Sequence, residues 1–106
     1  MRTYELRAYI LASSEALDSY RTVNYLRHLP SFAHHDIGLH GLWTAHDGSP
    51  VLYALVSYSD GADPGKVTEE FMNSAEFRAD VEGLDSSTII EVASTLLTPS
   101  AGSPLL

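Results

Sequence analysis

The sequence predicts one α+β domain over residues 1–106, with a four-stranded antiparallel sheet and two helices on one face. Three observations support this prediction. A chain of 106 residues can bury one hydrophobic core but not two. A hydrophobic fraction of 44% with six tyrosines is typical of a globular chain. Segments with strand and helix patterns follow one another in the order strand, helix, strand, strand, helix, strand.

The first strand is predicted over residues 3–10, where residue types alternate between two faces. One face is apolar, and the other carries Glu5, Arg7 and Tyr9. A Glu5–Arg7 pair at the surface would contribute little to stability. This charged face either contacts solvent or lines a cavity or a subunit interface, and the strand alone leaves both open.

The first helix is predicted to begin after Ser13 or Ser14, since either hydroxyl can cap a helix N-terminus. Helical spacing places Tyr20, Val23 and Asn24 on its inward side. A buried amide needs hydrogen-bond partners. Asn24 is therefore either a structural hydrogen-bonding group or a group aimed at a ligand.

The end of this helix is expected at Pro30, or a second short piece opens there, because proline lacks the amide hydrogen and its ring clashes with the preceding turn. His28 would lie at that break. All five histidines and the only tryptophan fall within residues 28–46. This stretch is where a pocket is expected.

A β-hairpin is predicted over residues 38–58, with turn chemistry at residues 46–50. Gly41 inside the first strand indicates a bulge or the close approach of a neighbour. The second strand is apolar on both faces and should be central. Strict alternation would place Leu39 and Trp43 together on one face of the sheet. His40 and Leu42 would then share the opposite face.

The second helix is predicted to follow Asp63 as its cap, with Pro64 in its first position. Asn73 and Ser74 permit a kink and a new cap, and Gly83 closes the helix. The last strand is predicted over residues 87–97. This order of elements is the split βαβ arrangement of a ferredoxin-like fold.

One face of such a sheet remains bare when both helices pack on the other. Leu42 and one apolar set from residues 51–58 are expected on the bare face. Large exposed apolar patches mark interaction sites. We therefore expect a second copy of the chain to cover this face as a homodimer.

Charge and composition exclude several classes of function. A net charge of −8 with six unclustered Lys and Arg residues argues against nucleic acid, whose phosphates require cations. The lack of cysteine excludes disulfides, iron–sulfur clusters and thiol catalysis. The N-terminus alternates and no stretch has the length of a membrane span, so we expect a cytoplasmic protein without a membrane partner.

The chain resembles the NIPSNAP family, within the wider group of dimeric α+β barrel proteins. The resemblance rests on four segments that together span nearly the whole chain: YELRAYIL, HLPSFAHHDIGLHGLW, FMNSAEFRADVEGL and LLTPSAGSPLL. Phe77 departs from the pattern, since the family often has tryptophan there. The resemblance implies a homodimer whose two sheets face each other, with a pocket between each subunit's own sheet and helices. Related barrels include polyketide cyclases, lactone isomerases and cofactor-free monooxygenases, and this step is analogy.

The predicted pocket combines acid–base groups with aromatic ones. The candidate catalytic residues are His28, His35 and Asp36, because a histidine can move a proton near neutral pH and a carboxylate can orient it. A hydrophobic cavity with a few aimed polar groups suits a planar aromatic or polyketide-like ligand. The candidate substrate-binding residues are Tyr20, Asn24, His34, His40, Trp43, Tyr58, Tyr9, Arg7 and Glu5.

We therefore predict a cofactor-independent enzyme that cyclises, dehydrates or isomerises a small hydrophobic substrate. Two alternatives stay open: a cofactor-free monooxygenase, in which Trp43 and Asn24 hold an electron-rich substrate beside oxygen, and a non-catalytic module that binds a small molecule or a protein. No metal is expected, because HxH and HExxH spacings are missing. Haem and nucleotide cofactors are not expected either.

Overall fold

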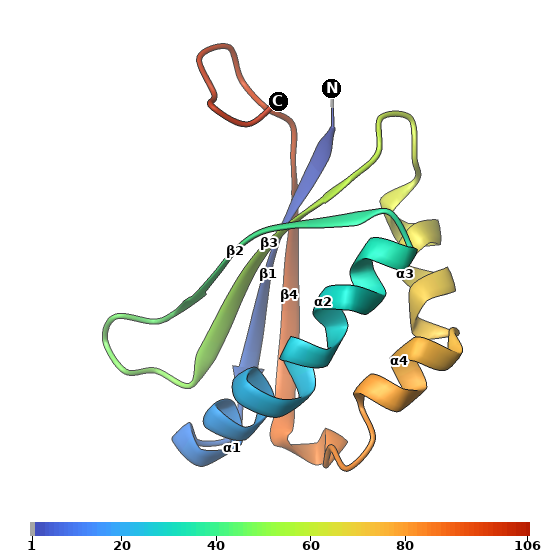
Figure 1. Cartoon of the computed structure of the whole chain (residues 1–106). Helices are drawn as coiled ribbons and strands as arrows, with labels where there is room; N and C mark the ends of the chain where they lie inside the picture. Colours follow the sequence, from blue (N-terminus) through green and yellow to red (C-terminus); the bar gives the residue numbers. More distant parts are fainter. Residues whose placement is uncertain (1) are drawn as a thin grey trace.

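The computed structural model describes residues 2–106 and has the predicted order of strands and helical regions (Figure 1). Each of the two predicted helical regions consists of more than one segment. The elements are β1 (Thr3–Leu11), α1 (Ser14–Ser19), the π-helical segment η1 (Tyr20–Asn24), α2 (Tyr25–His34), β2 (Ile37–Thr44), β3 (Val51–Tyr58), α3 (Pro64–Met72), α4 (Ala75–Asp80), the 3-10 segment η2 (Ser86–Thr88) and β4 (Ile89–Leu97).

The four strands form one antiparallel sheet in the order β2-β3-β1-β4. The prediction of a ferredoxin-like α+β fold is confirmed. The helices lie on one face of the sheet, and the long α2 crosses it diagonally (Figure 1). The core lies between these two layers, where alternate residues of β3 are buried: Leu52, Ala54, Val56 and Tyr58.

Three predicted helix caps are confirmed. The Ser13 hydroxyl accepts the amide of Ala16 at the start of α1. Asp63 caps α3, whose first residue is Pro64. Asn73 ends α3 and Ser74 caps α4, as predicted for a kink with a new cap. Each cap satisfies amides that the first turn of a helix leaves unpaired.

The first helical region contains a π-helical turn that the sequence did not predict. The amide of Tyr25 donates to the carbonyl of Tyr20, five residues earlier instead of four. This wider turn brings Tyr20, Asn24 and Tyr25 to the inward side together, and each is buried. Val23 was expected to face inward on a regular helix, but its side chain is 45% exposed.

Pro30 does not end the first helical region, and that prediction is wrong. It lies inside α2, which continues to His34. Pro30 and Leu26, four residues earlier, lie on the exposed side of α2, where water can hydrogen-bond the carbonyl freed by proline. Buried His28 and Phe32 anchor the helix on both sides of the proline.

The bulge predicted near Gly41 is present, and it changes which residues share a face. Leu39 pairs with Val56 and Gly41 with Leu55, so His40 is the extra residue of β2. Leu42 consequently lies on the helix-covered face with Leu39 and packs against the core. The expectation of Leu42 on the bare face is therefore wrong.

The face of the sheet without helices is apolar, as expected, and carries one apolar set of β3, although Leu42 is not part of it. Trp43 pairs with Tyr53 on this face, since directly paired residues point to the same side. Exposed fractions are 37% for Leu6, 52% for Trp43 and 40% for Leu97. We call this the outer face. In the part of the chain that is described, no helix has the length and apolar character needed to cross a membrane.

Candidate functional site

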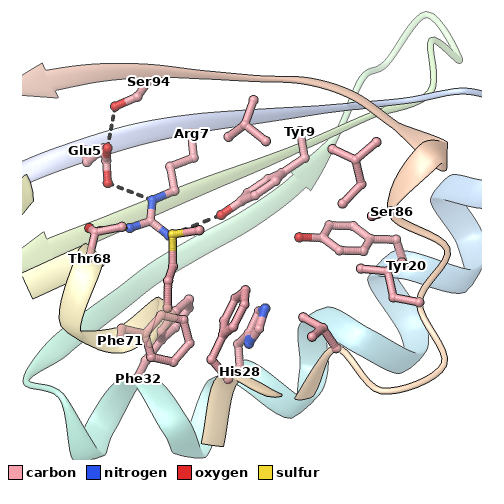
Figure 2. Close-up of a pocket in the computed structure, with 16 residues that line it drawn as sticks. Glu5, Arg7, Tyr9, Tyr20, His28, Phe32, Thr68, Phe71, Ser86 and Ser94 are labelled. Carbon is pink, nitrogen blue, oxygen red and sulfur yellow. Dashed lines mark hydrogen bonds and ion pairs between the residues drawn. The ribbon is translucent and has the colours of Figure 1, made fainter. Parts of the chain in front are cut away.

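A cavity of about 470 Å³ lies between β1 and β4 on one side and the helices on the other (Figure 2). Most of its wall is apolar, and its polar groups come mainly from β1, η1 and α2. Volumes of this size are typical of small-molecule sites. The lining residues are Glu5, Arg7, Tyr9, Tyr20, His28, Phe32, Thr68, Phe71, Met72, Phe77, Val81, Leu84, Ser86, Ile89, Val92 and Ser94.

The charged side of β1 faces this cavity, which settles the alternative that the sequence left open. Arg7 is only 7% exposed and is held by four hydrogen bonds. Its Nε donates to Glu5 Oε1 at 2.7 Å, and its Nη1 donates to Tyr9 Oη at 3.2 Å. Its Nη2 donates to Tyr58 Oη at 2.7 Å and to Thr68 Oγ1 at 3.3 Å.

Glu5 and Arg7 form an ion pair that stays charged. Burial raises the pKa of Glu5, but hydrogen bonds from Ser94 and Tyr58 and the charge of Arg7 outweigh it and hold that pKa below its usual value. Burial lowers the pKa of Arg7, but Tyr9, Tyr58 and Glu5 raise it further than burial lowers it. The pair therefore adds polarity to the cavity wall without net charge.

Three tyrosines pack together beside Arg7. The ring of Tyr9 packs at a tilt against Tyr20 and edge-on against Tyr25, with centroids 5.6 and 5.2 Å apart. The hydroxyls of Tyr9 and Tyr25 lie 3.2 Å apart and share a hydrogen bond. Burial raises the pKa of Tyr20 and of Tyr25, so both phenols stay protonated at neutral pH.

His28 faces the cavity from the middle of α2 and is backed by a carboxylate. Its Nδ1 lies 2.8 Å from Oδ2 of Asp80, and both residues are buried. The imidazole stacks parallel to Phe77, with centroids 5.6 Å apart and an interplanar angle of 4°. A carboxylate beside Nδ1 and a flat apolar neighbour fix both the tautomer and the ring plane.

The other ring nitrogen of His28 is available to a ligand. No residue within 2–106 forms a hydrogen bond with Nε2. Every buried side-chain nitrogen or oxygen of these residues does have a hydrogen-bond partner. Nε2 is therefore not buried, and it is reachable from the cavity that His28 lines. Burial lowers the pKa of His28, and the nearby Asp80 offsets this only in part. At neutral pH the imidazole is therefore neutral, with a proton on Nδ1 and a free lone pair on Nε2.

Five of the predicted site residues line the cavity together: Glu5, Arg7, Tyr9, Tyr20 and His28. Two others lie behind its wall. Tyr58 is fully buried and bonds to Arg7. Asn24 donates to the backbone carbonyl of Asp80 at 3.4 Å, which is the structural role that the sequence offered as one of two readings.

His34, His35 and Asp36 lie apart from this cavity, around a smaller hollow of about 290 Å³ at the end of α2. Nε2 of His35 lies 2.6 Å from Oε2 of Glu76. Asp36 has a left-handed backbone with φ of 56° directly after the helix, so it ends α2 and does not contact His28. Because α2 continues past Pro30, these residues are carried away from the cavity.

His40 and Trp43 also lie outside the cavity, on the opposite side of the sheet. Nε2 of His40 lies 2.7 Å from the Ser57 hydroxyl, and its ring packs on Tyr4. Trp43 folds over Gly41, where a Cβ atom would meet the indole ring at 2.2 Å. The bulge at His40 is the reason, since it turns Trp43 to the outer face.

Asp80 is the residue that sequence reasoning missed. A carboxylate in the last turn of a helix opposes the negative end of the helix dipole, so it needs another reason to be there. This unfavourable position is the feature of the sequence that could have indicated a special role for Asp80. Among the described residues, no group of three or more His, Asp or Glu side chains could hold a metal ion. The predictions about cofactors stay untested.

The fold and cavity define a class: a ferredoxin-like α+β domain with a ligand-sized, mostly apolar cavity between sheet and helices. The chain belongs to the NIPSNAP family, whose family model matches residues 4–104. This confirms the resemblance seen in the sequence. No curated protein matches the chain at a significant level.

Similar solved structures come from several bacteria. An Agrobacterium tumefaciens NIPSNAP family protein of unknown function has a TM-score of 0.80 and 18% identity, covering 99% of this chain and 94% of that chain. An uncharacterised Burkholderia xenovorans NIPSNAP domain protein has a TM-score of 0.77 and 17% identity, covering 96% and 98%. A putative antibiotic biosynthesis monooxygenase from Caulobacter crescentus has a TM-score of 0.68 and 10% identity, covering 93% and 90%. At these identities the likeness supports the fold alone.

Proposed function

We propose that this chain is a cofactor-independent enzyme in which His28 moves protons on a small hydrophobic, aromatic or polyketide-like substrate. The observation that carries the proposal is the His28–Asp80 pair, with Nδ1 held at 2.8 Å and Nε2 open to an apolar cavity. A neutral imidazole with a fixed tautomer is the equipment of a general base near neutral pH.

The proposed reaction begins at a C–H bond beside a substrate carbonyl. Nε2 of His28 takes the proton, the electron pair of that bond forms a carbon–carbon double bond, and the π electrons of the carbonyl move onto its oxygen, which gives an enolate. The Asp80 carboxylate stabilises the imidazolium that forms. Return of the proton to a different carbon completes an isomerisation. If the enolate carbon attacks a second carbonyl, the imidazolium protonates the new alkoxide, and loss of water completes a dehydrating cyclisation.

The cavity wall favours flat substrates. Phe32 and Phe77 stack on the imidazole of His28, and Phe71 meets it edge-on at 5.4 Å. Aromatic rings prefer such stacked and edge-on neighbours. Polar contacts lie on the sheet side, at Arg7 and Tyr9. A bicyclic aromatic ketone combines both features and is a suitable probe.

The test is hydrogen–deuterium exchange into 2-tetralone in D₂O, followed by proton NMR. The wild-type protein is expected to accelerate loss of the C1 hydrogens, and His28→Gln is expected to reduce the acceleration by about 100-fold or more. His46→Gln is the matched control, because His46 lies outside the cavity lining, in the turn after β2. Equal rates with and without wild-type protein would contradict the proposal and favour a non-catalytic binding module.

A second candidate is a cofactor-free monooxygenase, favoured by the similarity of the fold to putative antibiotic biosynthesis monooxygenases from Caulobacter crescentus and Nitrosomonas europaea. His28 would again remove the proton. Oxygen would then convert a ring CH₂ group to a carbonyl, with the second oxygen atom leaving as water. Trp43 cannot hold this substrate, because it lies on the outer face. Oxygen uptake with anthrone would distinguish this reaction from simple proton transfer.

We also propose that a second copy of the chain covers the outer face. Exposed apolar side chains come from three strands of that face: Leu6, Trp43 and Leu97. Their combined patch crosses the sheet from one edge to the other, which is unusual for a surface left in water. The homodimer and the cytoplasmic location remain predictions from the sequence.

A further inference from the structure

The hydroxyl of Tyr20 has no protein partner and is reachable from the cavity, since no buried side-chain nitrogen or oxygen of residues 2–106 lacks a hydrogen bond. Tyr20 is 4% exposed and lines the cavity. No residue within 2–106 bonds to its hydroxyl, whereas Tyr9, Tyr25 and Tyr58 are all hydrogen-bonded. Figure 2 shows the Tyr20 hydroxyl pointing into the cavity. A donor that opens into a mostly apolar cavity can give its hydrogen bond only to a ligand or to water there.

Local structure supports a role for Tyr20 in binding a ligand. Tyr20 begins η1, and π-helical turns are frequent at functional sites. Burial raises the pKa of its phenol. The phenol therefore keeps its hydrogen at neutral pH and can donate it to an oxygen atom of a ligand.

Arg7 offers a second unused donor. A guanidinium has five N–H groups, and the four bonds to Glu5, Tyr9, Tyr58 and Thr68 leave one N–H on Nη1. Glu5 already balances the charge of Arg7. A ligand carboxylate would therefore meet Glu5 as a like charge, whereas an uncharged oxygen would not.

We infer that Tyr20 and Arg7 donate hydrogen bonds to uncharged ring oxygens, and that the substrate is a neutral oxygenated aromatic compound, a phenol or ketone, and not a carboxylic acid. This inference rests on the proposed function in taking the cavity as the substrate site. It does not depend on proton transfer by His28. When a carbonyl becomes an enolate, a hydrogen bond from either donor stabilises the negative charge that develops on its oxygen.

The experiment compares three probes of one shape by isothermal titration calorimetry at pH 7: 2-naphthol, naphthalene and 2-naphthoate. Wild-type protein is expected to bind 2-naphthol tightest. Tyr20→Phe is expected to weaken 2-naphthol binding by about three- to tenfold, which corresponds to the loss of one hydrogen bond. The affinity for naphthalene is expected to stay unchanged. Tyr53→Phe is the matched control, since Tyr53 lies on the outer face.

Three results would overturn the inference: 2-naphthoate binding as tightly as 2-naphthol, a 2-naphthol preference as large in Tyr20→Phe as in the wild type, or no binding of any probe. His28→Gln is expected to keep the 2-naphthol preference. A protein that shows this preference but does not exchange 2-tetralone would contradict proton transfer by His28 and leave the oxygen-binding role of Tyr20 and Arg7 intact.

Discussion

Nδ1 of His28 lies 2.8 Å from Oδ2 of Asp80, although the residues are 52 positions apart in the chain and belong to different helices, α2 and α4. Asp80 also accepts hydrogen bonds at its backbone carbonyl from Asn24 and Arg27, both at 3.4 Å. The first helical region therefore fixes both the side chain and the backbone carbonyl of Asp80. The catalytic proposal depends on that arrangement.

Replacing the carboxylate without changing its size tests the arrangement. In Asp80→Asn, the side-chain amide can donate to Nδ1, which moves the imidazole proton to Nε2 and removes the base from the cavity. We expect the rate of 2-tetralone exchange to fall by about 10²- to 10⁴-fold with the fold intact. Glu82→Gln is the control, because that residue is exposed and the hydrogen bonds it makes involve only its backbone atoms. A folded Asp80→Asn variant with the wild-type rate would exclude Asp80 from the mechanism.

Stability should fall on mild acidification because of His28. Its pKa is lowered in the folded state from an ordinary value of 6.5, mainly by burial. Below pH 6.5 the unfolded chain binds a proton that the folded chain resists, so the free energy of unfolding decreases as the pH falls. The contribution is fully present above pH 6.5.

Urea unfolding at pH 7.0 and 5.5 measures this effect. The wild type is expected to lose more stability between these pH values than His28→Gln, which has no imidazole to protonate at this site. The pKa of Glu5 is also lowered in the folded state, so Glu5 too reduces the free energy of unfolding on acidification. This second reduction begins only below pH 4.5, the ordinary pKa of a glutamate. An identical loss in wild type and His28→Gln would contradict the assignment to His28.

The Glu5–Arg7 pair should show strong coupling. Arg7→Met leaves the partly buried Glu5 carboxylate without its cation and is expected to lower the free energy of unfolding by about 3 kcal/mol. Glu5→Gln combined with Arg7→Met is expected to be less harmful than the two single changes added together. Urea denaturation of the four proteins gives the coupling energy as a double-mutant cycle. Additive losses would mean that the two side chains do not stabilise each other.

Local chemistry explains which parts of the fold the sequence could predict. Ser13, Asp63 and Ser74 cap helices through bonds to amides two or three residues away, so short sequence patterns are sufficient to find them. The alternation in β1 likewise predicted two faces. Which face met the cavity depended on packing against distant helices, and the strand alone could not decide it.

The misplaced site residues have two local causes with long-range effects. Pro30 stays helical because His28 and Phe32 are buried on either side of it, and this carries His35 away from the cavity. A single extra residue at His40 turns Trp43 to the other side of the sheet. Asp80 has no sequence pattern that pairs it with His28. The residues of the first strand and helix were identified, and their partner from α4 was missed.

The outer face provides the last prediction, a dimer that a single charge should break. Leu6 lies on the central strand β1 of that face, between β3 and β4. Leu6→Asp would bury a carboxylate among apolar side chains, which costs far more than any contact it could make. Light scattering after gel filtration is expected to show twice the mass of one chain for the wild type and a single-chain mass for Leu6→Asp.

Two further measurements make this test specific. Leu26→Asp is the control, because Leu26 is 48% exposed on α2, away from the outer face. It should remain a dimer. Trp43, the only tryptophan, reports on the same face, so its fluorescence should shift to longer wavelength when Leu6→Asp exposes it to water. A wild-type protein with the mass of one chain at micromolar concentration would exclude the homodimer, and the outer face would then need another explanation for its apolar surface.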